Sequence, residues 1–238
     1  MDLKVELPVY SCPKLARPFP IDGDLTKDHW RTARFIHLIP TTTGRDDPTP
    51  AYQSTKVAAC WTDTHFYTAF HCEDRDIWSS YTNRDDPLYD EEVVELFLCP
   101  TGDLTRYYEI EVSPRNVIFD AKVFSPDLNR TTMAVDASWD CPNLQTAVQV
   151  NGNLNSRPST INHQPSTINQ SWSVELAIPF AAFPEAARPK PGNAWRANFY
   201  RIDRADPPEF TAWSPTREVP PNFHVPEMFG WLRFEAGG

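Results

Sequence analysis

The chain has 238 residues, with 32 Asp and Glu against 22 Lys and Arg, so its formal net charge at pH 7 is −10. This acidic balance argues against nucleic acid or an anionic membrane as the main partner. No apolar run is long enough to span a bilayer, and residues 1–15 contain no hydrophobic segment of signal-peptide length. We therefore expect either an intracellular protein or a secreted or periplasmic one whose signal peptide has been removed.

Short alternating segments rich in β-branched and aromatic residues follow one another along the chain, which is typical of strands. The 24 prolines disfavour helices, and a single helical turn is expected at 180–187. These patterns predict one all-β domain over residues 1–238, an antiparallel β-sandwich of jelly-roll or immunoglobulin-like type. In chain order, the predicted strands are 30–38, 55–61, 65–73, 92–99, 107–112, 121–125, 137–140, 144–150, 171–179, 195–203, 209–213 and 229–235.

One segment, 151–171, differs in composition from the rest of the chain. The sequence PSTIN occurs in it twice, at 158–162 and at 165–169. Its Asn, Ser, Thr and Pro residues have little apolar surface to bury. We expect a flexible hairpin insertion between two strands, with no chemical role.

The segments 92–99 and 107–112 alternate most clearly and face each other across a polar turn. One face of this pair is apolar and belongs in the core. The other face carries Glu95, Glu109 and Glu111, with Tyr89 at its entrance. The alternation predicts solvated carboxylates beside an aromatic ring, an arrangement suited to a hydroxyl-rich ligand.

The cysteine count of five is odd, and no CxxC pair occurs, which excludes a zinc ribbon or a thioredoxin-type motif. Buried free thiols are expected. Cys60 and Cys72 lie on adjacent predicted strands, so a disulfide between them stays open for an oxidising compartment.

Three blocks of sequence carry a resemblance to a known family. They are IDGDLTKDHW, then LYDEEVVELFLCP with YYEIEVSP, and finally SWSVELAIPF, WRANFYRID and FHVPEMFGWLRF. In this order the chain resembles the family 9 carbohydrate-binding modules of the DOMON-like sandwich superfamily, over nearly its full length. The resemblance implies a β-sandwich that binds a sugar or glycan end without cleaving it, in a slot between two aromatic rings. It also implies a partner: an associated catalytic domain or enzyme.

By the same resemblance, Tyr89 and Phe223 stand where the family has two Trp rings, and Glu95 matches the family's Glu on the central strand. The next polar positions match Glu109 and Glu111, where the family has Arg and Asn types, so the identity of the sugar stays open. A further polar position falls at Tyr200 or Arg201, with the register undecided. Arg84 and Arg201 are candidate ligand-binding residues as well, with salt bridges to the glutamates as the alternative.

Members of this family also bind calcium at structural sites, which the resemblance extends to this chain. Hard oxygen ligands in loops suit Ca²⁺. For each candidate the alternative is a solvated carboxylate in a turn. The candidate ligands are Asp22, Asp24, Glu73, Asp74 and Asp76.

Three other functions remain open at this stage. Asp90, Glu92 and Glu95 have the acid spacing of jelly-roll glycosidases, although an odd step of five residues needs a bulge to bring the outer pair to one face. Haem binding occurs in other DOMON-like sandwiches through Met and His or Lys, and Met133, Met228 and His224 are the available side chains here. The third alternative is a plain interaction module beside an enzyme.

Overall fold

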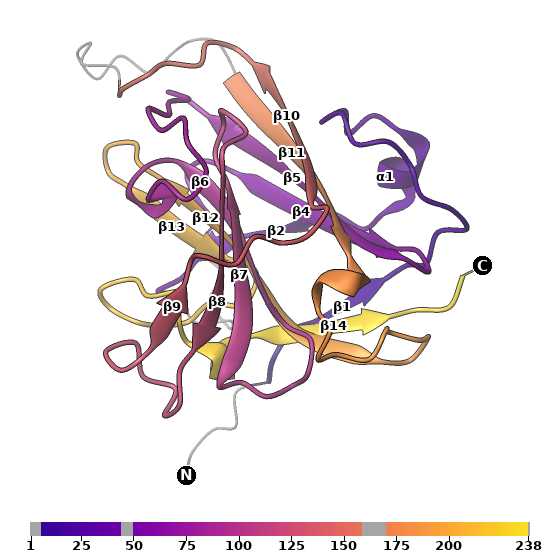
Figure 1. The fold of residues 1–238 in the computed structure, drawn as a ribbon. Helices are drawn as coiled ribbons and strands as arrows, with labels where there is room; N and C mark the ends of the chain where they lie inside the picture. The colour runs from indigo at the N-terminus through magenta and orange to yellow at the C-terminus, as the bar shows by residue number, and fades with distance from the viewer. Residues whose placement is uncertain (1–5, 44–49, 159–169, 238) are drawn as a thin grey trace.

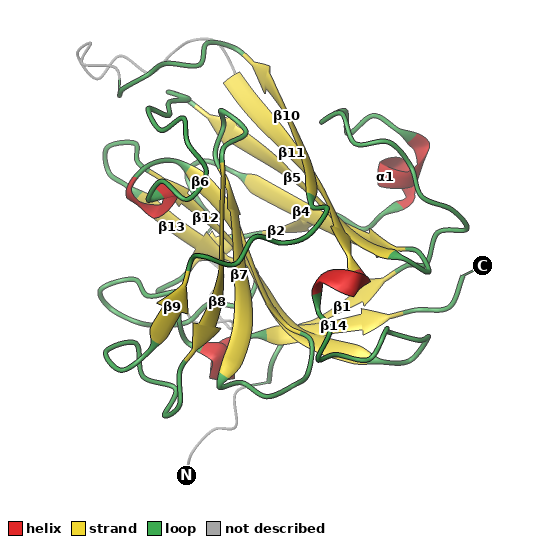
Figure 2. Cartoon of the chain, viewed as in Figure 1, coloured by secondary structure: helices red, strands yellow, loops and turns green. Residues whose placement is uncertain are grey.

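The structure is a computed structural model that describes residues 6–43, 50–158 and 170–237. In these ranges fourteen strands form two packed sheets, and helix is confined to short segments (Figures 1 and 2). The helical segments are α1 (Asp28–Thr32) and the 3₁₀ turns η1 (Leu88–Asp90), η2 (Phe180–Ala182) and η3 (Pro226–Met228). The predicted all-β sandwich is confirmed. No helix in these ranges is long and apolar enough to cross a membrane.

The larger sheet has nine strands within the described residues, and all of its neighbouring pairs are antiparallel except β1 with β14. Its main path runs through β1 (Val9–Cys12), β14 (Gly230–Phe234), β12 (Ala194–Asp203), β6 (Val93–Cys99), β7 (Arg106–Val112), β8 (Ile118–Phe124) and β9 (Ala134–Asp136), and β13 (Glu209–Ala212) pairs with both β12 and β3 (Ile39–Pro40).

The smaller sheet is antiparallel and packs against the larger one. Its order is β10 (Gln145–Asn151), β11 (Gln170–Pro179), β5 (His65–Asp74), β4 (Thr55–Trp61) and β2 (Ile36–His37). β10 and β11 flank the predicted insertion at 151–171, of which residues 159–169 lie outside the described part of the chain.

Alternation along the central strands decides which side chains enter which core. Val94, Leu96 and Leu98 of β6 point between the two sheets, as predicted. Phe97 of β6 and Tyr107 of β7 point to the outer face of the large sheet, where they form a second apolar cluster under loops. The large sheet is therefore covered on both faces.

One local expectation is wrong. Trp30 does not begin a strand but lies in α1, and only Ile36–His37 of the predicted segment 30–38 forms one.

The expectation of buried free thiols is confirmed, because all five cysteines are buried and free. Cys60 faces Tyr67 and Cys72 faces Thr55 in the β4–β5 ladder, so the disulfide that was left open between them does not form.

The sequence block IDGDLTKDHW, residues 21–30, is attached to the small sheet through one buried carboxylate, Glu175 of β11. Its oxygens accept hydrogen bonds from the Trp30 indole and from the Gly23 backbone N–H at 2.8 Å, and they pair with Lys27 Nζ at 2.7 Å. Glu175 is fully buried. The block is thus a strap over the outer face of the small sheet.

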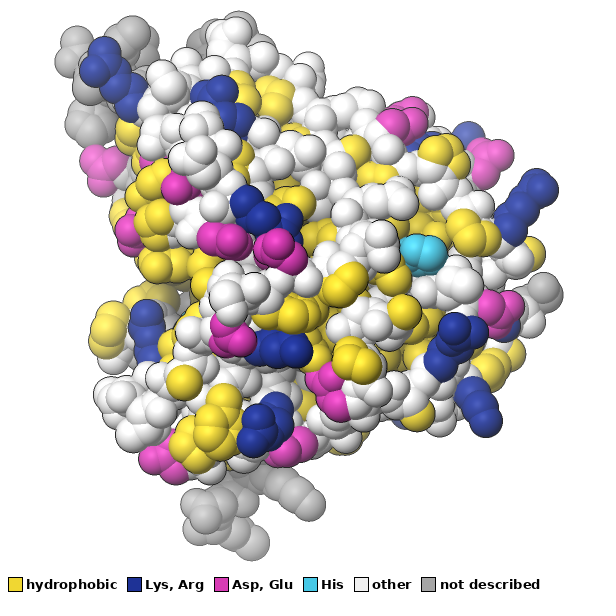
Figure 3. All heavy atoms as spheres, viewed as in Figure 1, with side chains coloured by type: hydrophobic (Ala, Val, Ile, Leu, Met, Phe, Trp, Pro, Cys, Tyr) yellow, Lys and Arg dark blue, Asp and Glu magenta, His cyan; other side chains and the backbone are white. Residues whose placement is uncertain are grey.

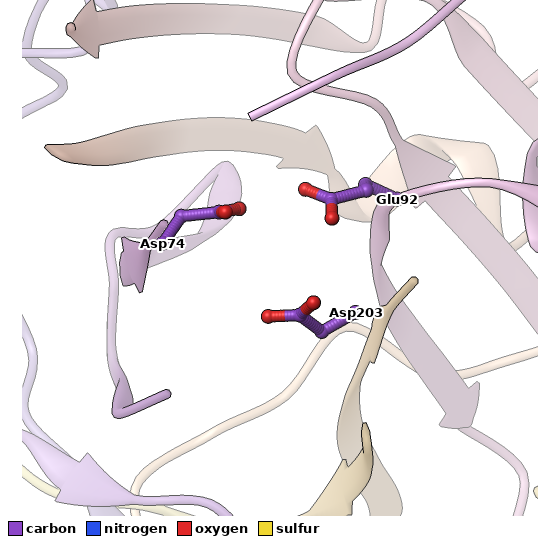
Figure 4. A group of neighbouring side chains, drawn as sticks. All are labelled: Asp74, Glu92 and Asp203. Carbon is purple, nitrogen blue, oxygen red and sulfur yellow. The ribbon is translucent and has the colours of Figure 1, made fainter. Parts of the chain in front are cut away.

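A second polar group, the Arg201 cluster (Asp74, Glu92, Arg201 and Asp203), joins the two sheets. The Arg201 guanidinium of β12 lies 2.7 Å from Asp74 Oδ2 of β5 and 2.8 Å from Asp203 Oδ2. The three carboxylates point toward one another (Figure 4), with ligand-type oxygens within 4.8 Å. Both oxygens of Glu92 are buried without a hydrogen-bond partner. Burial, followed by the charges of Asp74 and Asp203, holds the pKa of Glu92 well above its usual range.

Lys and Arg side chains are interspersed with Asp and Glu side chains on the face shown in Figure 3, rather than gathered in one basic patch.

We expect Glu175→Ala to lower the free energy of unfolding by about 3 kcal/mol, because Trp30, Gly23 and Lys27 lose a buried charged acceptor. For a domain of this size the melting temperature should fall by roughly 6–12 °C. Glu218→Ala, at an exposed position, is the control and should leave it unchanged. An unchanged melting temperature for Glu175→Ala would contradict the role of the strap.

Glu92→Gln should leave stability unchanged in acid and raise it relative to wild type in alkali. The folded pKa of Glu92 lies above its unfolded value, so its contribution is complete below about pH 4 and is lost as pH rises through the folded pKa. Urea unfolding at pH 4 and pH 9 measures the difference. Arg201→Met, by contrast, leaves buried carboxylates unpaired and should cost about 3–5 kcal/mol. A Glu92→Gln variant that is less stable at pH 9 would contradict this interpretation and point to a second cation in the cluster.

Candidate functional site

A cavity of about 480 Å³ opens on the outer face of the large sheet. Side chains of β6, β7, β8 and β12 reach it, and three segments wall it: η1, the stretch from 130 to 135, and the loop from 221 to 224. Its lining consists of Tyr89, Asp90, Glu95, Glu109, Phe119, Arg130, Met133, Val135, Ile202, Arg204, Phe210, Pro221, Asn222, Phe223 and His224.

Both predicted aromatic residues line this cavity. Tyr89, the middle residue of η1, is 45% exposed and stands edge-on to Phe119, with ring centroids 5.8 Å apart. Phe223 is buried and stacks on Tyr200, with centroids 4.2 Å apart and planes at 11°. The Tyr200 hydroxyl donates to the Phe223 carbonyl at 3.0 Å, so Tyr200 positions Phe223 from below.

The three predicted glutamates come together as an acidic cluster, which we call the glutamate floor. Glu95 and Glu109 line the cavity, and Glu111 faces Glu95 across the β6–β7 ladder. Their carboxylate oxygens lie within 4.8 Å of one another. The prediction that they are solvated is wrong: all three are buried, because the second apolar cluster and its loops cover this face.

The floor is poorly supplied with hydrogen-bond donors. Glu95 Oε1 and both oxygens of Glu111 are buried without a hydrogen-bond partner. Burial raises the pKa of Glu109 to about 7. It also holds the pKa values of Glu95 and Glu111 well above their usual range, where the neighbouring glutamates raise them further. The floor therefore holds protons near neutral pH when no cation is beside it.

One wall of the cavity contributes a histidine. His224 Nδ1 is hydrogen-bonded to the Tyr107 hydroxyl at 2.9 Å, and its Nε2 lies 3.9 Å from Glu109. Burial, with a smaller effect of the Arg130 charge, lowers the pKa of His224 to about 4. His224 is therefore a neutral polar group at physiological pH.

Two arginines of the lining were not predicted from the sequence. The Arg204 guanidinium donates to the Tyr89 carbonyl at 2.7 Å and lies over the Phe210 ring. The sequence could have indicated Arg204, because this residue directly follows β12 and therefore lies near the start of β6, where Ile202 pairs with Val93. Arg130 lies in the β8–β9 connection, where no periodicity indicates its direction.

The remaining predicted ligand-binding residues lie elsewhere. Arg201 points to the opposite face of β12 from Tyr200, into the Arg201 cluster, which settles the undecided register. Arg84 donates to Asp120 and Asp140, outside the cavity lining. Both arginines thus form salt bridges, but with partners other than the three glutamates.

The five predicted calcium ligands do not gather into one site. Among described residues only Asp74 of the five belongs to a group of three close acidic side chains, and there Arg201 already supplies the cation. Asp22 pairs with Lys27, and Asp24 accepts the backbone N–H of Thr26. In the Arg201 cluster one guanidinium faces three carboxylates, and calcium there or elsewhere stays a prediction.

The residues of the alternative functions are also placed. Asp90 and Glu95, the outer pair of the predicted glycosidase pattern, both line the cavity, whereas Glu92, the middle acid, lies in the Arg201 cluster. Met133 and His224 both line the cavity, where His224 is engaged with Tyr107.

The chain is similar to known proteins in sequence and in fold. The sequence matches the model of carbohydrate-binding family 9 over residues 49–234, a range that contains the whole cavity. A curated relative, an extracellular protein of Arthroderma benhamiae, is 29% identical over 155 residues. This match spans 63% of the chain and 63% of the relative, less than two thirds of the relative's length.

Solved structures share the fold. A Bacteroides uniformis protein assigned to carbohydrate binding superposes with a TM-score of 0.70 at 20% identity, covering 95% of this chain and 99% of that one. A family 9 module from Caldicellulosiruptor kristjanssonii in complex with cellotriose has a TM-score of 0.62 at 15% identity, covering 97% and 95% of the two chains. The module in complex with glucose gives 0.59 at 15% identity, covering 98% and 97%.

The family model alone covers well over half of the sequence, and the sandwich of the structure agrees with the fold of the family's solved modules. The chain therefore belongs to carbohydrate-binding family 9.

Proposed function

We propose that the protein is a non-catalytic carbohydrate-binding module that holds a sugar or glycan end in the cavity lined by Tyr89, Phe223, Glu95 and Glu109. The observation that carries the proposal is the meeting of two aromatic rings and two carboxyl groups in one cavity, inside the range that matches the family.

The chemistry of a pyranose suits this lining. Its C–H faces are apolar and its rim carries hydroxyls, so aromatic rings cover the faces while carboxyl groups bind the rim. Covering both faces removes about 100–150 Å² of apolar surface from water, worth roughly 3–4 kcal/mol. The cost of association offsets much of this gain. We expect affinity for one sugar in roughly the micromolar to millimolar range.

Tyr89 is the ring best placed to receive a ligand. It is 45% exposed, whereas Phe223 is 7% exposed and rests on Tyr200. In our proposal Phe223 is a fixed wall and Tyr89 the accessible platform.

The solved modules with cellotriose and glucose make these two sugars the first ligands to test. A catalytic domain or enzyme acting on the same polysaccharide is the proposed partner. Calcium as a structural ion is a proposal without an assigned site.

Tyr89→Ala should weaken binding of cellotriose or glucose at least tenfold, because the platform is removed, and leave the melting temperature within about 2 °C. Calorimetric titration and thermal unfolding measure the two effects. Tyr52→Ala, at a tyrosine that is 67% exposed and outside the cavity lining, is the matched control and should bind as wild type. If Tyr89→Ala unfolds the protein, the ring belongs to the core and the site is misplaced.

Cellotriose incubated with the protein should be recovered intact, because we propose a binding module, and Glu92 of the glycosidase pattern lies outside the cavity that Asp90 and Glu95 line. Chromatography of the sugar after prolonged incubation checks this. Release of glucose that disappears in Glu95→Gln would instead establish a glycosidase.

A further inference from the structure

The glutamate floor gathers more acidic groups than the binding of a neutral sugar requires. An ionised Glu side chain is acceptor-only, so it can accept hydrogen bonds from sugar hydroxyls or from a cation. Here three glutamates occupy one place, and Glu95 Oε1 and both Glu111 oxygens are buried with no hydrogen-bond partner. An unpartnered buried acceptor costs stability unless a ligand or a proton satisfies it.

The charges that face the floor leave it acidic. Asp90, Glu95 and Glu109 line the cavity, and Glu111 lies beside them. The positive groups in the lining are Arg130 and Arg204. Arg204 donates to the Tyr89 carbonyl and lies over the Phe210 ring, although its Nε is buried without a hydrogen-bond partner, and Arg130 is exposed. The charges of both arginines lower the pKa of Glu95, but burial and the neighbouring Glu109 raise it more, so that it stays well above its usual range. The remaining titratable groups that face the floor, Tyr89, Tyr107 and His224, add no positive charge, because burial keeps the imidazole neutral.

A primary ammonium group matches this arrangement. It carries one positive charge and three N–H donors and has no acceptor. Charge-assisted hydrogen bonds to carboxylates are stronger than those between neutral groups. The aromatic rings that line the same cavity suit the apolar faces of a sugar ring. We therefore place the ammonium group and the sugar ring in a single ligand.

We propose that the cavity selects an amino sugar with a free amine, such as a glucosamine unit at a glycan end, and binds its ammonium group at Glu95 and Glu109 beside the buried Glu111. This inference rests on the proposed sugar-binding function. An N-acetylated amine is neutral and bulkier, and it is excluded from this position.

Binding is coupled to proton release. The free floor holds protons near neutral pH, since burial raises the pKa of Glu109 to about 7 and holds those of Glu95 and Glu111 well above their usual range. An ammonium ion favours the ionised carboxylates, so protons leave the floor for the buffer while the amine keeps its own. Affinity for glucosamine should therefore rise from pH 5 to pH 7.5.

The test is calorimetric titration of the full chain with glucosamine, N-acetylglucosamine and glucose at pH 7.5, each with chelator and with CaCl₂. In the presence of chelator, we expect glucosamine to bind at least tenfold more tightly than N-acetylglucosamine or glucose. Its binding heat should change with the ionisation enthalpy of the buffer, because protons are released on binding. Glu109→Gln should lose this preference, because it removes one of the two carboxylates proposed to bind the ammonium group. The wild-type comparison with N-acetylglucosamine decides the proposal even if that variant does not fold.

Each other outcome overturns the inference in a distinguishable way. Glucose that binds as tightly as glucosamine leaves the sugar-binding function standing and removes the amine preference. Heat from CaCl₂ alone at the floor, abolished in Glu109→Gln, replaces the ammonium by a divalent cation. No binding of any sugar to the folded protein removes both this inference and the proposed function.

Discussion

Alternation along β6 is the constraint on which the rest of the structure depends. Val94, Leu96 and Leu98 enter the space between the sheets, so Val93, Glu95 and Phe97 must point to the outer face. Glu92, three residues before Glu95, points instead to the Arg201 cluster. The alternation along this segment thus determines which side chains enter the main core, the Arg201 cluster and the glutamate floor. A shift of its register by one residue would turn each side chain to the opposite face of the sheet.

Burial gives the acidic groups of this protein their properties. Glu95 and Glu111 lie in apolar surroundings on a face that most antiparallel sandwiches leave to solvent. Desolvation favours their neutral forms, and a cation beside them reverses that preference. The same physics operates at the Arg201 cluster, where the guanidinium supplies the cation permanently. In our account the floor differs because its cation arrives with the ligand.

Much of the fold and part of the site could be predicted from residue patterns. The faces of β6 and β7, the all-β class and the two cavity aromatics follow from alternation and from the order of the sequence blocks. The burial of the glutamates does not, because it depends on Phe223, Phe229 and other loop residues folding over the sheet from distant positions. The sequence pattern places Trp30 in a strand, because nothing local indicates that its indole N–H donates to Glu175, 145 residues away. Arg84 and Arg201 were expected near the glutamates, but their partners come from other strands and loops.

The central claim of this account is that the sugar lies in the cavity on the outer face of the large sheet. Mapping backbone amide shifts by NMR during titration with cellotriose, and then with glucosamine, tests it most directly. We predict that the largest changes fall on Glu95, Glu109 and residues 221–224, around the cavity lining. Changes confined to the small sheet, or to the Arg201 cluster with the cavity residues unmoved, would contradict the claim.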